Sequence, residues 1–117
     1  MIVVTVLYEN DSSDDFNMDY YLSTHMPLVK EQLGQYGCTK YEVLSGVSDA
    51  NPAEPAIYSV IASLYFDTVE HVHEGFKATG RAVMGDIPNF TNVKPKFQIS
   101  EATEVWLADD YVHSNNH

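Results

Sequence analysis

The sequence predicts a single α+β domain with four strands and two helical regions in the order βαββαβ. Two observations lead to this fold class. Apolar residues follow the two-residue period of a strand in four stretches, and they recur every three or four residues in two further stretches. The strand-like stretches are 2–8, 38–46, 57–66 and 96–100, and the helix-like stretches are 16–36 and 67–80. For this order we expect an antiparallel sheet with both helical regions on one face.

The first predicted strand, 2–8, is apolar or β-branched on both of its alternating faces. That pattern is typical of a strand that is covered on both sides. An acidic turn follows the strand. We expect Asp14 or Asp15 to cap a helix that begins near Phe16, because a carboxylate accepts hydrogen bonds from the free N–H groups of a first turn.

Pro27 interrupts the first helical region. It disfavours helical backbone angles at the preceding residue, and it has no N–H group to donate to the carbonyl of Ser23. Since proline suits the first turn of a new segment, we expect the helix to be broken or kinked beside His25. Beyond the proline, an apolar stripe at helical spacing predicts a segment that packs against another element; it consists of Met26, Val29, Leu33 and Tyr36.

A long loop separates the second and third strands. The stretch 38–46 alternates in polarity, and the loop at 49–56 contains two prolines. The third strand, 57–66, has one wholly apolar or aromatic face and one mixed face. Tyr58, Val60, Ala62, Leu64 and Phe66 form the apolar face, and Ile57, Ser59, Ile61, Ser63 and Tyr65 form the mixed face.

The capping-box sequence Asp67-Thr68-Val69-Glu70 predicts the start of the second helix, and we expect this helix to end near Gly80. His73 falls on its apolar face, so we expect a core histidine that is hydrogen bonded through its ring nitrogens. A metal site at His71 and His73 is not expected, because side chains two residues apart on a helix point about 200° apart. The fourth strand, 96–100, alternates apolar and polar residues.

The helices leave one face of the predicted sheet uncovered, although that face carries apolar residues such as Ile57 and Ile61. The simplest cover is a second copy of the chain, so we expect a homodimer packed sheet to sheet. We assign residues 1–101 to the domain and residues 102–117 to a C-terminal extension. The apolar triplet at 105–107 makes this extension a candidate for contact with the partner subunit.

Charge and motif content exclude several functional classes. Six Lys and Arg stand against 17 Asp and Glu, a formal net charge of -11, so we expect no nucleic-acid partner. The longest apolar run is far shorter than the roughly 20 residues of a membrane-spanning helix. Nothing resembles a secretory signal, and we therefore expect a cytoplasmic protein without a membrane partner. The sequence has no dinucleotide, P-loop, nucleophile-elbow or metal motif, so no cofactor and no metal are expected.

The region that carries chemistry is 16–28, where aromatic residues surround the helix break. His25 has the side chain whose unperturbed pKa, about 6.5, suits a general acid or base near neutral pH. Tyr21 lies one turn before it, and an aromatic wall with one titratable group would suit a flat, apolar, enolisable or phenolic ligand. The alternative left open by these residues is structural: His25 would cap the segment after Pro27 by donating to a freed carbonyl.

A second motif, Asp86-Ile87-Pro88-Asn89-Phe90, precedes the fourth strand. An Asp, an Asn and a Phe held by a proline could close one end of a pocket, and loops commonly carry function. The alternative is ordinary turn chemistry, in which Asp86 and Asn89 bond to their own backbone.

Two motifs, one within residues 6–29 and one at 84–91, together resemble the EthD family, which is named for an ethyl tert-butyl ether degradation protein. The resemblance covers about residues 1–101 and is carried by Val6-Leu7-Tyr8 with Phe16, by Asp19-Tyr20-Tyr21, by His25-Met26-Pro27-Leu28-Val29, and by Met84-Gly85-Asp86-Ile87-Pro88-Asn89-Phe90-Thr91. It implies a ferredoxin-like α+β fold of the dimeric α+β barrel superfamily, in which two such sheets pack to form a barrel.

The resemblance also implies a ligand pocket between sheet and helices for a small hydrophobic or aromatic compound. Related members are linked to oxidoreductase or polyketide-tailoring steps, and cofactor-free enzymes of the wider superfamily use His, Tyr or Asn as proton handlers. By this analogy His25 is the catalytic candidate of a cofactor-independent oxidoreductase or oxygenase, or of a lyase or isomerase, in degradation or polyketide-type tailoring. The candidate substrate-binding residues are Tyr20, Tyr21, Tyr65, Asp86, Asn89 and Phe90. The alternative is a non-catalytic dimeric accessory protein that carries a ligand for a partner oxygenase.

Overall fold

The strands and helical regions follow one another in the predicted order βαββαβ. The computed structural model describes residues 1–11 and 15–109. The elements are β1 (Ile2–Glu9), α1 (Met18–Tyr20), a π-helical segment η1 (Tyr21–His25), α2 (Met26–Gly34), β2 (Cys38–Ser45), β3 (Tyr58–Phe66), α3 (Val69–Gly85), a 3-10 turn η2 (Ile87–Asn89) and β4 (Lys96–Glu101). The α+β class and the order of elements are thus confirmed.

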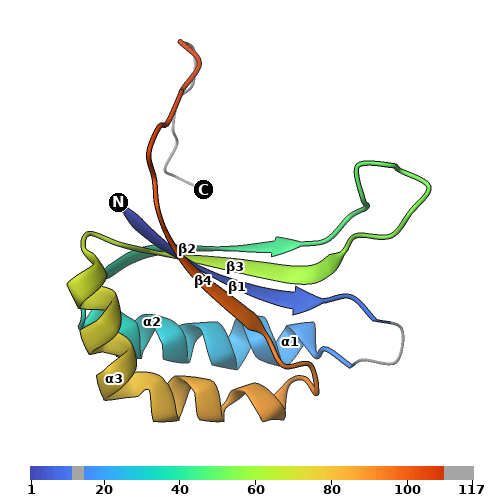
Figure 1. The fold of residues 1–117 in the computed structure, drawn as a ribbon. Helices are drawn as coiled ribbons and strands as arrows, with labels where there is room; N and C mark the ends of the chain where they lie inside the picture. The colour runs from blue at the N-terminus through green and yellow to red at the C-terminus, as the bar shows by residue number, and fades with distance from the viewer. Residues whose placement is uncertain (12–14, 110–117) are drawn as a thin grey trace.

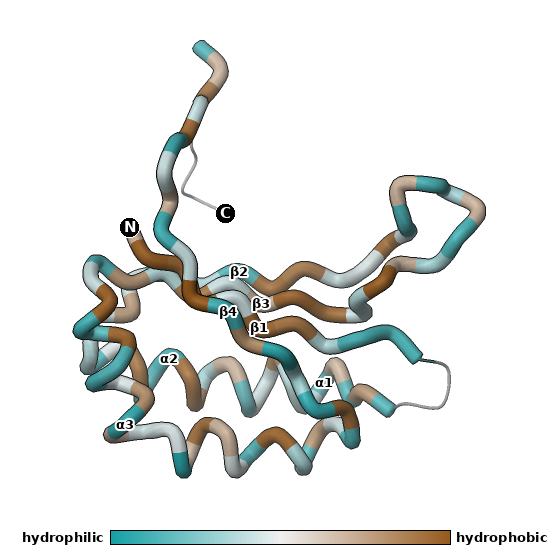
Figure 2. The backbone as a smooth tube through the Cα atoms, viewed as in Figure 1, coloured by the Kyte–Doolittle hydropathy of each residue, from teal (hydrophilic) through white to brown (hydrophobic). Residues whose placement is uncertain are grey.

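The sheet is antiparallel, and its strand order is β2-β3-β1-β4. All helical elements lie on one face of it, so the domain has two layers (Figure 1). Hydrophobic residues follow one another along much of β1 and β3, whereas they alternate with hydrophilic residues along the helices (Figure 2). This arrangement places the core between the sheet and the helices.

The apolar face of β3 is the face that meets the helices. Val60, Ala62, Leu64 and Phe66 are buried there, and Val4, Val6 and Tyr8 of β1 are buried beside them. Burying an aliphatic or aromatic side chain contributes about 1.5–3 kcal/mol, so this row accounts for much of the stability of the layer. The two-faced pattern predicted for the third strand is correct.

The first helical region differs from the prediction at both its start and its middle. Asn17 is the N-cap, and its side chain accepts a hydrogen bond from the N–H of Tyr20. Phe16 cannot begin the helix because it forms an isolated β-bridge with Thr91. The predicted cap at Asp15 is therefore wrong by two residues, and Asp14 lies outside the described residues.

The expected break beside His25 takes the form of a π-helical segment. The N–H of Met26 donates to the carbonyl of Tyr21, five residues earlier, and α2 begins at Met26 with Pro27 in its first turn. The helix therefore is not interrupted at Pro27; instead its turn is widened just before the proline, over Tyr21–His25. Such π-helical turns are rare, and many of those known lie at functional sites.

The second helix, α3, is longer than predicted. Thr68 is the N-cap and accepts a hydrogen bond from the N–H of His71, so Glu70 does not occupy the third position of a capping box. The helix runs past Gly80 to Gly85. At Gly75 an added Cβ would lie 3.1 Å from Leu33, which shows that this glycine allows α3 to approach α2 closely.

The opposite face of the sheet carries no helix. Leu7, Ile61 and Leu44 form an apolar row across β1, β3 and β2 on that face, and Leu44 is 52% exposed. Residues 102–108 have no regular structure and extend beyond the sheet on this side, as does the loop between β2 and β3 (Figure 1). None of the helices in the described part of the chain has the length and apolar character needed to cross a lipid bilayer.

Candidate functional site

Two segments that are far apart in the sequence meet at the start of the helical layer. The N–H of Asn17 donates to the carbonyl of Phe90 at 2.8 Å, and the hydroxyl of Thr91 donates to the carbonyl of Asp15. These bonds tie the turn before α1 to the segment after η2. As a result, the two sequence motifs around His25 and Asp86 form one site.

Asp86 is the centre of a hydrogen-bonded cluster. His25 Nδ1 lies 3.0 Å from Asp86 Oδ2, while the hydroxyl of Tyr20 and the amide of Asn89 donate to Asp86 Oδ1 at 2.8 and 2.9 Å. Burial tends to raise the pKa of Asp86, but the hydrogen bonds from Asn89, Tyr20 and His25 lower it below its usual range. Asp86 is therefore a carboxylate at neutral pH, and a carboxylate can only accept, so His25 Nδ1 carries a hydrogen.

His25 is buried, with 4% of its surface exposed. Its ring stacks on Tyr21 at a centroid distance of 5.5 Å and lies 4.6 Å from the ring of Phe90. Burial lowers the pKa of His25, and the hydrogen bond to Asp86 opposes that effect in part. His25 is thus neutral at pH 7, and since Nδ1 holds the hydrogen, Nε2 is the basic nitrogen. No hydrogen bond links Nε2 to another described residue.

His25 lines a small cavity between the sheet and the helices. The cavity has a volume of about 30 Å³. Space of this size holds one or two water-sized groups. Its walls are otherwise mostly apolar: Val6, Tyr8, Tyr21, Met26, Val29, Ala62, Leu64, Phe76, Val83, Met84, Ile87 and Phe97.

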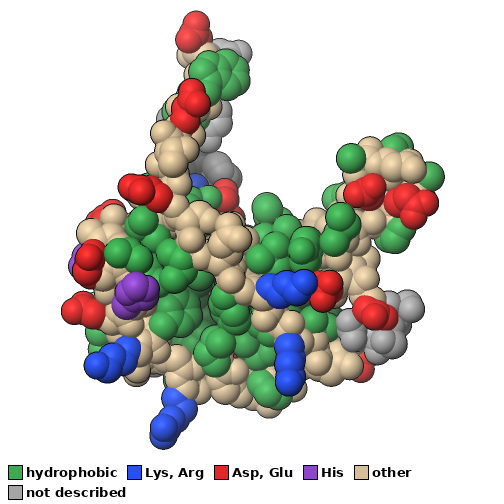
Figure 3. Space-filling view, in the orientation of Figure 1, with side chains coloured by type: hydrophobic (Ala, Val, Ile, Leu, Met, Phe, Trp, Pro, Cys, Tyr) green, Lys and Arg blue, Asp and Glu red, His purple; other side chains and the backbone are tan. Residues whose placement is uncertain are grey.

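A larger groove lies beside this cavity, between α3 and the edge strand β4. It has a volume of about 240 Å³, and every wall residue but His73 is apolar: Val4, Val72, Phe76, Met84, Phe97 and Ile99. The space-filling view shows a hollow lined by hydrophobic side chains on this face (Figure 3). The groove is open because β4 is an edge strand whose apolar side chains, including Phe97 at 41% exposure, are not covered by a helix.

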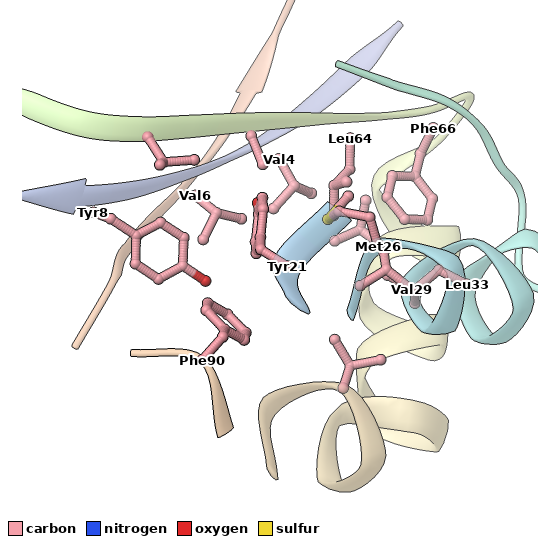
Figure 4. Packing of buried hydrophobic residues seen from close by; sticks show 14 residues of the cluster. Val4, Val6, Tyr8, Tyr21, Met26, Val29, Leu33, Leu64, Phe66 and Phe90 are labelled. Carbon is pink, nitrogen blue, oxygen red and sulfur yellow. The ribbon is translucent and has the colours of Figure 1, made fainter. Parts of the chain in front are cut away.

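Two tyrosines line the same cavity as His25. Tyr8 and Tyr21 are each 1% exposed, and both line the cavity. Neither hydroxyl hydrogen bonds to another described residue, and neither is a fully enclosed oxygen, because His71 Nδ1 is the one fully buried side-chain polar atom without a partner among the described residues. The hydroxyl of Tyr8 points inward, on the side of Tyr21 and Phe90 (Figure 4). Burial raises the pKa of both phenols, so each remains a neutral hydrogen-bond donor.

The structure brings most of the sequence-predicted site residues together. Tyr21 and Phe90 contact the His25 ring, while Tyr20, Asp86 and Asn89 form the cluster that holds it. Tyr65 lies elsewhere: it is on the opposite face of the sheet, and its hydroxyl donates to Glu42 at 2.9 Å. The expectation that Tyr65 shares this site is corrected by the strand register.

Sequence reasoning missed Tyr8 and the groove. Tyr8 continues the alternating apolar face of the first strand, and its position at the strand end is the signal that could have identified it. The prediction of His73 as a core residue is wrong, because its side chain is exposed at the groove. Within the described ranges, no group of three or more His, Cys, Asp or Glu side chains could hold a metal ion.

Comparisons with known proteins agree with this fold. The model of the EthD domain family matches residues 10–94. The structure of an EthD-like protein from Ralstonia eutropha is similar with a TM-score of 0.82 and 31% sequence identity, over 88% of this chain and 92% of that chain. No curated protein matches the chain.

Two more distant structures support the fold alone. An EthD family protein from Bacillus halodurans has a TM-score of 0.62 and 21% identity, over 87% of this chain and 98% of that one. A protein from an uncultured marine organism, described as dimeric and ferredoxin-like, has a TM-score of 0.52 and 11% identity, over 92% of this chain and 100% of that one. The expected ferredoxin-like fold is confirmed.

Proposed function

Since this chain belongs to the EthD family, we propose that it binds a small, largely apolar compound between its sheet and its helices and that His25 moves a proton on that compound. The observation that carries this proposal is the pairing of His25 with Asp86. A partly buried carboxylate holds one ring nitrogen, and the other nitrogen is left basic on a ring that lines a cavity. Such an arrangement is what general base catalysis requires.

The proposed step is the removal of a proton from the ligand. His25 Nε2 accepts a proton from an acidic C–H or O–H group, and the electron pair stays on the ligand as an enolate or phenolate. The imidazolium formed in this way is stabilised by Asp86, 3.0 Å from Nδ1. In this scheme Tyr8 and Tyr21, which line the same cavity as His25, donate hydrogen bonds to the oxygen on which negative charge develops.

Tyr20 and Asn89 act as positioning residues in this scheme. Both donate to Oδ1 of Asp86, so that Oδ2 remains available for His25. The hydrogen bond to Asp86 raises the pKa of Tyr20, which keeps it a donor. Positioning groups of this kind fix the tautomer and the orientation of a catalytic imidazole.

Returning the proton to another atom would make the reaction an isomerisation. Expulsion of a leaving group from the carbon β to the carbonyl, with the enolate electron pair forming the new C=C bond and the leaving group taking its own bonding pair, would make it a lyase reaction. An oxidoreductase or oxygenase reaction would use the enolate as the electron donor and dioxygen as the electron acceptor. All three begin with the same proton transfer, so a test of that transfer addresses the shared step.

A second candidate function is a non-catalytic ligand carrier for a partner oxygenase. The observation that favours it is the distribution of space: about 240 Å³ lies in the apolar groove, against about 30 Å³ at His25. A carrier needs the groove but not the basic nitrogen. It would bind its ligand equally well without His25.

The uncovered sheet face supports a homodimer. Leu7, Ile61 and Leu44 would be buried against the same row of a second copy, and a structural neighbour is described as dimeric. Sheets pack about 10 Å apart, so residues 102–109, which project on this side, are long enough to pass the interface and contact the partner subunit (Figure 1).

The test of proton transfer is deuterium exchange into 2-tetralone, a flat ketone with acidic C–H groups. Exchange in D₂O is followed by NMR with the wild-type protein, with His25→Asn and with Asp86→Asn. We expect a rate above that of buffer, a loss of about 10²- to 10⁴-fold in His25→Asn, and a smaller loss in Asp86→Asn. Asp67→Asn is the matched control, since Asp67 is an exposed aspartate outside the site.

Two results would separate the candidates. If 2-tetralone binds to the protein, as measured by titration calorimetry, but exchanges no faster than in buffer, the carrier function is favoured over catalysis. If His25→Asn retains the full exchange rate while Asp67→Asn behaves as expected, the assignment of His25 is contradicted.

A further inference from the structure

The cavity at His25 and the groove between α3 and β4 share three wall residues. Phe76 and Met84 come from α3, and Phe97 comes from β4. Each of these side chains borders the cavity on one side and the groove on the other. The two spaces are therefore neighbours, separated by side chains alone.

These three side chains are able to move. Met84 is 39% exposed and Phe97 is 41% exposed, so neither is locked in the core, and Phe76 is partly buried. Methionine has three rotatable bonds and adapts to irregular spaces. A shift of these groups would join the cavity to the groove without moving the sheet.

The two spaces differ in chemistry. The cavity offers polar atoms, because His25, Tyr8 and Tyr21 line it, but it holds only one or two water-sized groups. The groove offers almost no polar atoms, but it is about eight times larger. A ligand that satisfies both spaces has an oxygen at one end and an apolar body.

Resting on the proposed function, we infer that the ligand is an elongated amphiphile that threads between Phe76, Met84 and Phe97. Its terminal phenol, enol or ketone oxygen occupies the cavity at His25, and its hydrocarbon body lies in the groove as far as Ile99. The position of the groove next to the cavity favours a single small molecule over a protein segment, since a helix or strand could not enter a space of 30 Å³.

A series of 4-alkylphenols tests this placement. Dissociation constants of phenol, 4-ethylphenol, 4-butylphenol and 4-hexylphenol are measured by titration calorimetry on the full chain. If the alkyl group enters the groove, affinity rises about fourfold with each added methylene, which corresponds to about 0.8 kcal/mol, until the groove is filled. A ligand held at the cavity alone gains nothing from the longer chain.

Charge substitutions locate the alkyl group. Ile99→Glu places a carboxylate in the groove, and His73→Glu places one on the opposite wall. We expect both variants to bind phenol within about twofold of wild type and to lose most of the gain from the hexyl chain. Gln98→Glu is the matched control, because it adds the same charge one residue away on the other face of β4 and should retain the gain.

The outcomes distinguish this inference from the proposed function. If phenol binds but the longer chains do not bind more tightly, the inference is overturned and the proposed function stands. A hexyl gain that survives both Ile99→Glu and His73→Glu also overturns it. If no phenol of the series binds, the inference and the proposed ligand site fail together. Unchanged phenol affinity in the variants shows that they are folded.

Discussion

Replacing Asp86 with alanine should destabilise the fold because it leaves one buried donor, the Nδ1–H group of His25, without its acceptor. His25 Nδ1 is bonded to Asp86, and the side chains of His25 and Asp86 are only 5% and 13% exposed, so water is a poor replacement for the lost acceptor. A buried donor left without a partner costs about 1–3 kcal/mol, and bonds to charged groups lie in the upper part of that range. Asn89 is exposed, and its amide can bond to water instead. We therefore expect a loss of about 2–3 kcal/mol in the free energy of unfolding.

This loss is measured by urea denaturation at a fixed protomer concentration, because association would otherwise shift the apparent stability. For a chain of 117 residues it corresponds to a fall of about 10 °C in Tm. Asn89→Ala and the exposed-site control Asp67→Ala should each change stability by about 0.5 kcal/mol or less. If Asp86→Ala costs no more than these two variants, the His25–Asp86 bond does not have the role assigned to it.

Two further predictions concern pH and the C-terminal extension. Burial lowers the pKa of His25 in the folded state, so on acidification the unfolded chain takes up a proton before the folded chain does, and the free energy of unfolding should fall as the pH drops below about 6.5. His25→Asn should remove this contribution to the pH dependence of stability between pH 7 and 5. Parallel plots of stability against pH for wild type and His25→Asn would contradict the prediction. The pKa of Asp86 is also lowered, which adds a further loss only at more acidic pH. Trp106, the single tryptophan, is 81% exposed in the isolated chain. If the C-terminal extension contacts the partner subunit, the fluorescence of Trp106 should shift to the blue as the dimer forms, and deletion of 102–117 should weaken the dimer. Emission typical of an exposed indole at every protein concentration would rule out this contact.

Most of the fold could be predicted from local patterns. The alternation in 57–66 identified β3 and its buried face, and the stripe at Met26, Val29 and Leu33 identified the face of α2 that meets the sheet. Local patterns failed where a distant segment decides the geometry. Phe16 forms a β-bridge with Thr91, so Asn17 is the N-cap and the helix begins at Met18. No feature near Phe16 in the sequence indicates that contact.

The candidate site was predicted in part, for the same reason. A proline after His25 indicated an irregular helix, but the π-helical form depends on which carbonyl the N–H of Met26 reaches. Asp86 was a loop residue of uncertain role in the sequence, and its distance of 3.0 Å from His25 arises from pairing between segments about sixty residues apart. Tyr65 was misplaced although alternation puts it on the same face of the strand as Ile57 and Ile61, the face that the sequence predicts to be uncovered by helices.

The central claim is that Asp86 holds the hydrogen of His25 on Nδ1 and leaves Nε2 basic. The most direct test is two-dimensional ¹⁵N–¹H NMR of the imidazole rings at pH 7, with the His25 signals among the five histidines assigned by comparison with His25→Asn. The account predicts a neutral ring protonated at Nδ1, and loss of that fixed tautomer in Asp86→Ala. A His25 ring protonated at Nε2, or one that carries both protons at pH 7, would contradict it.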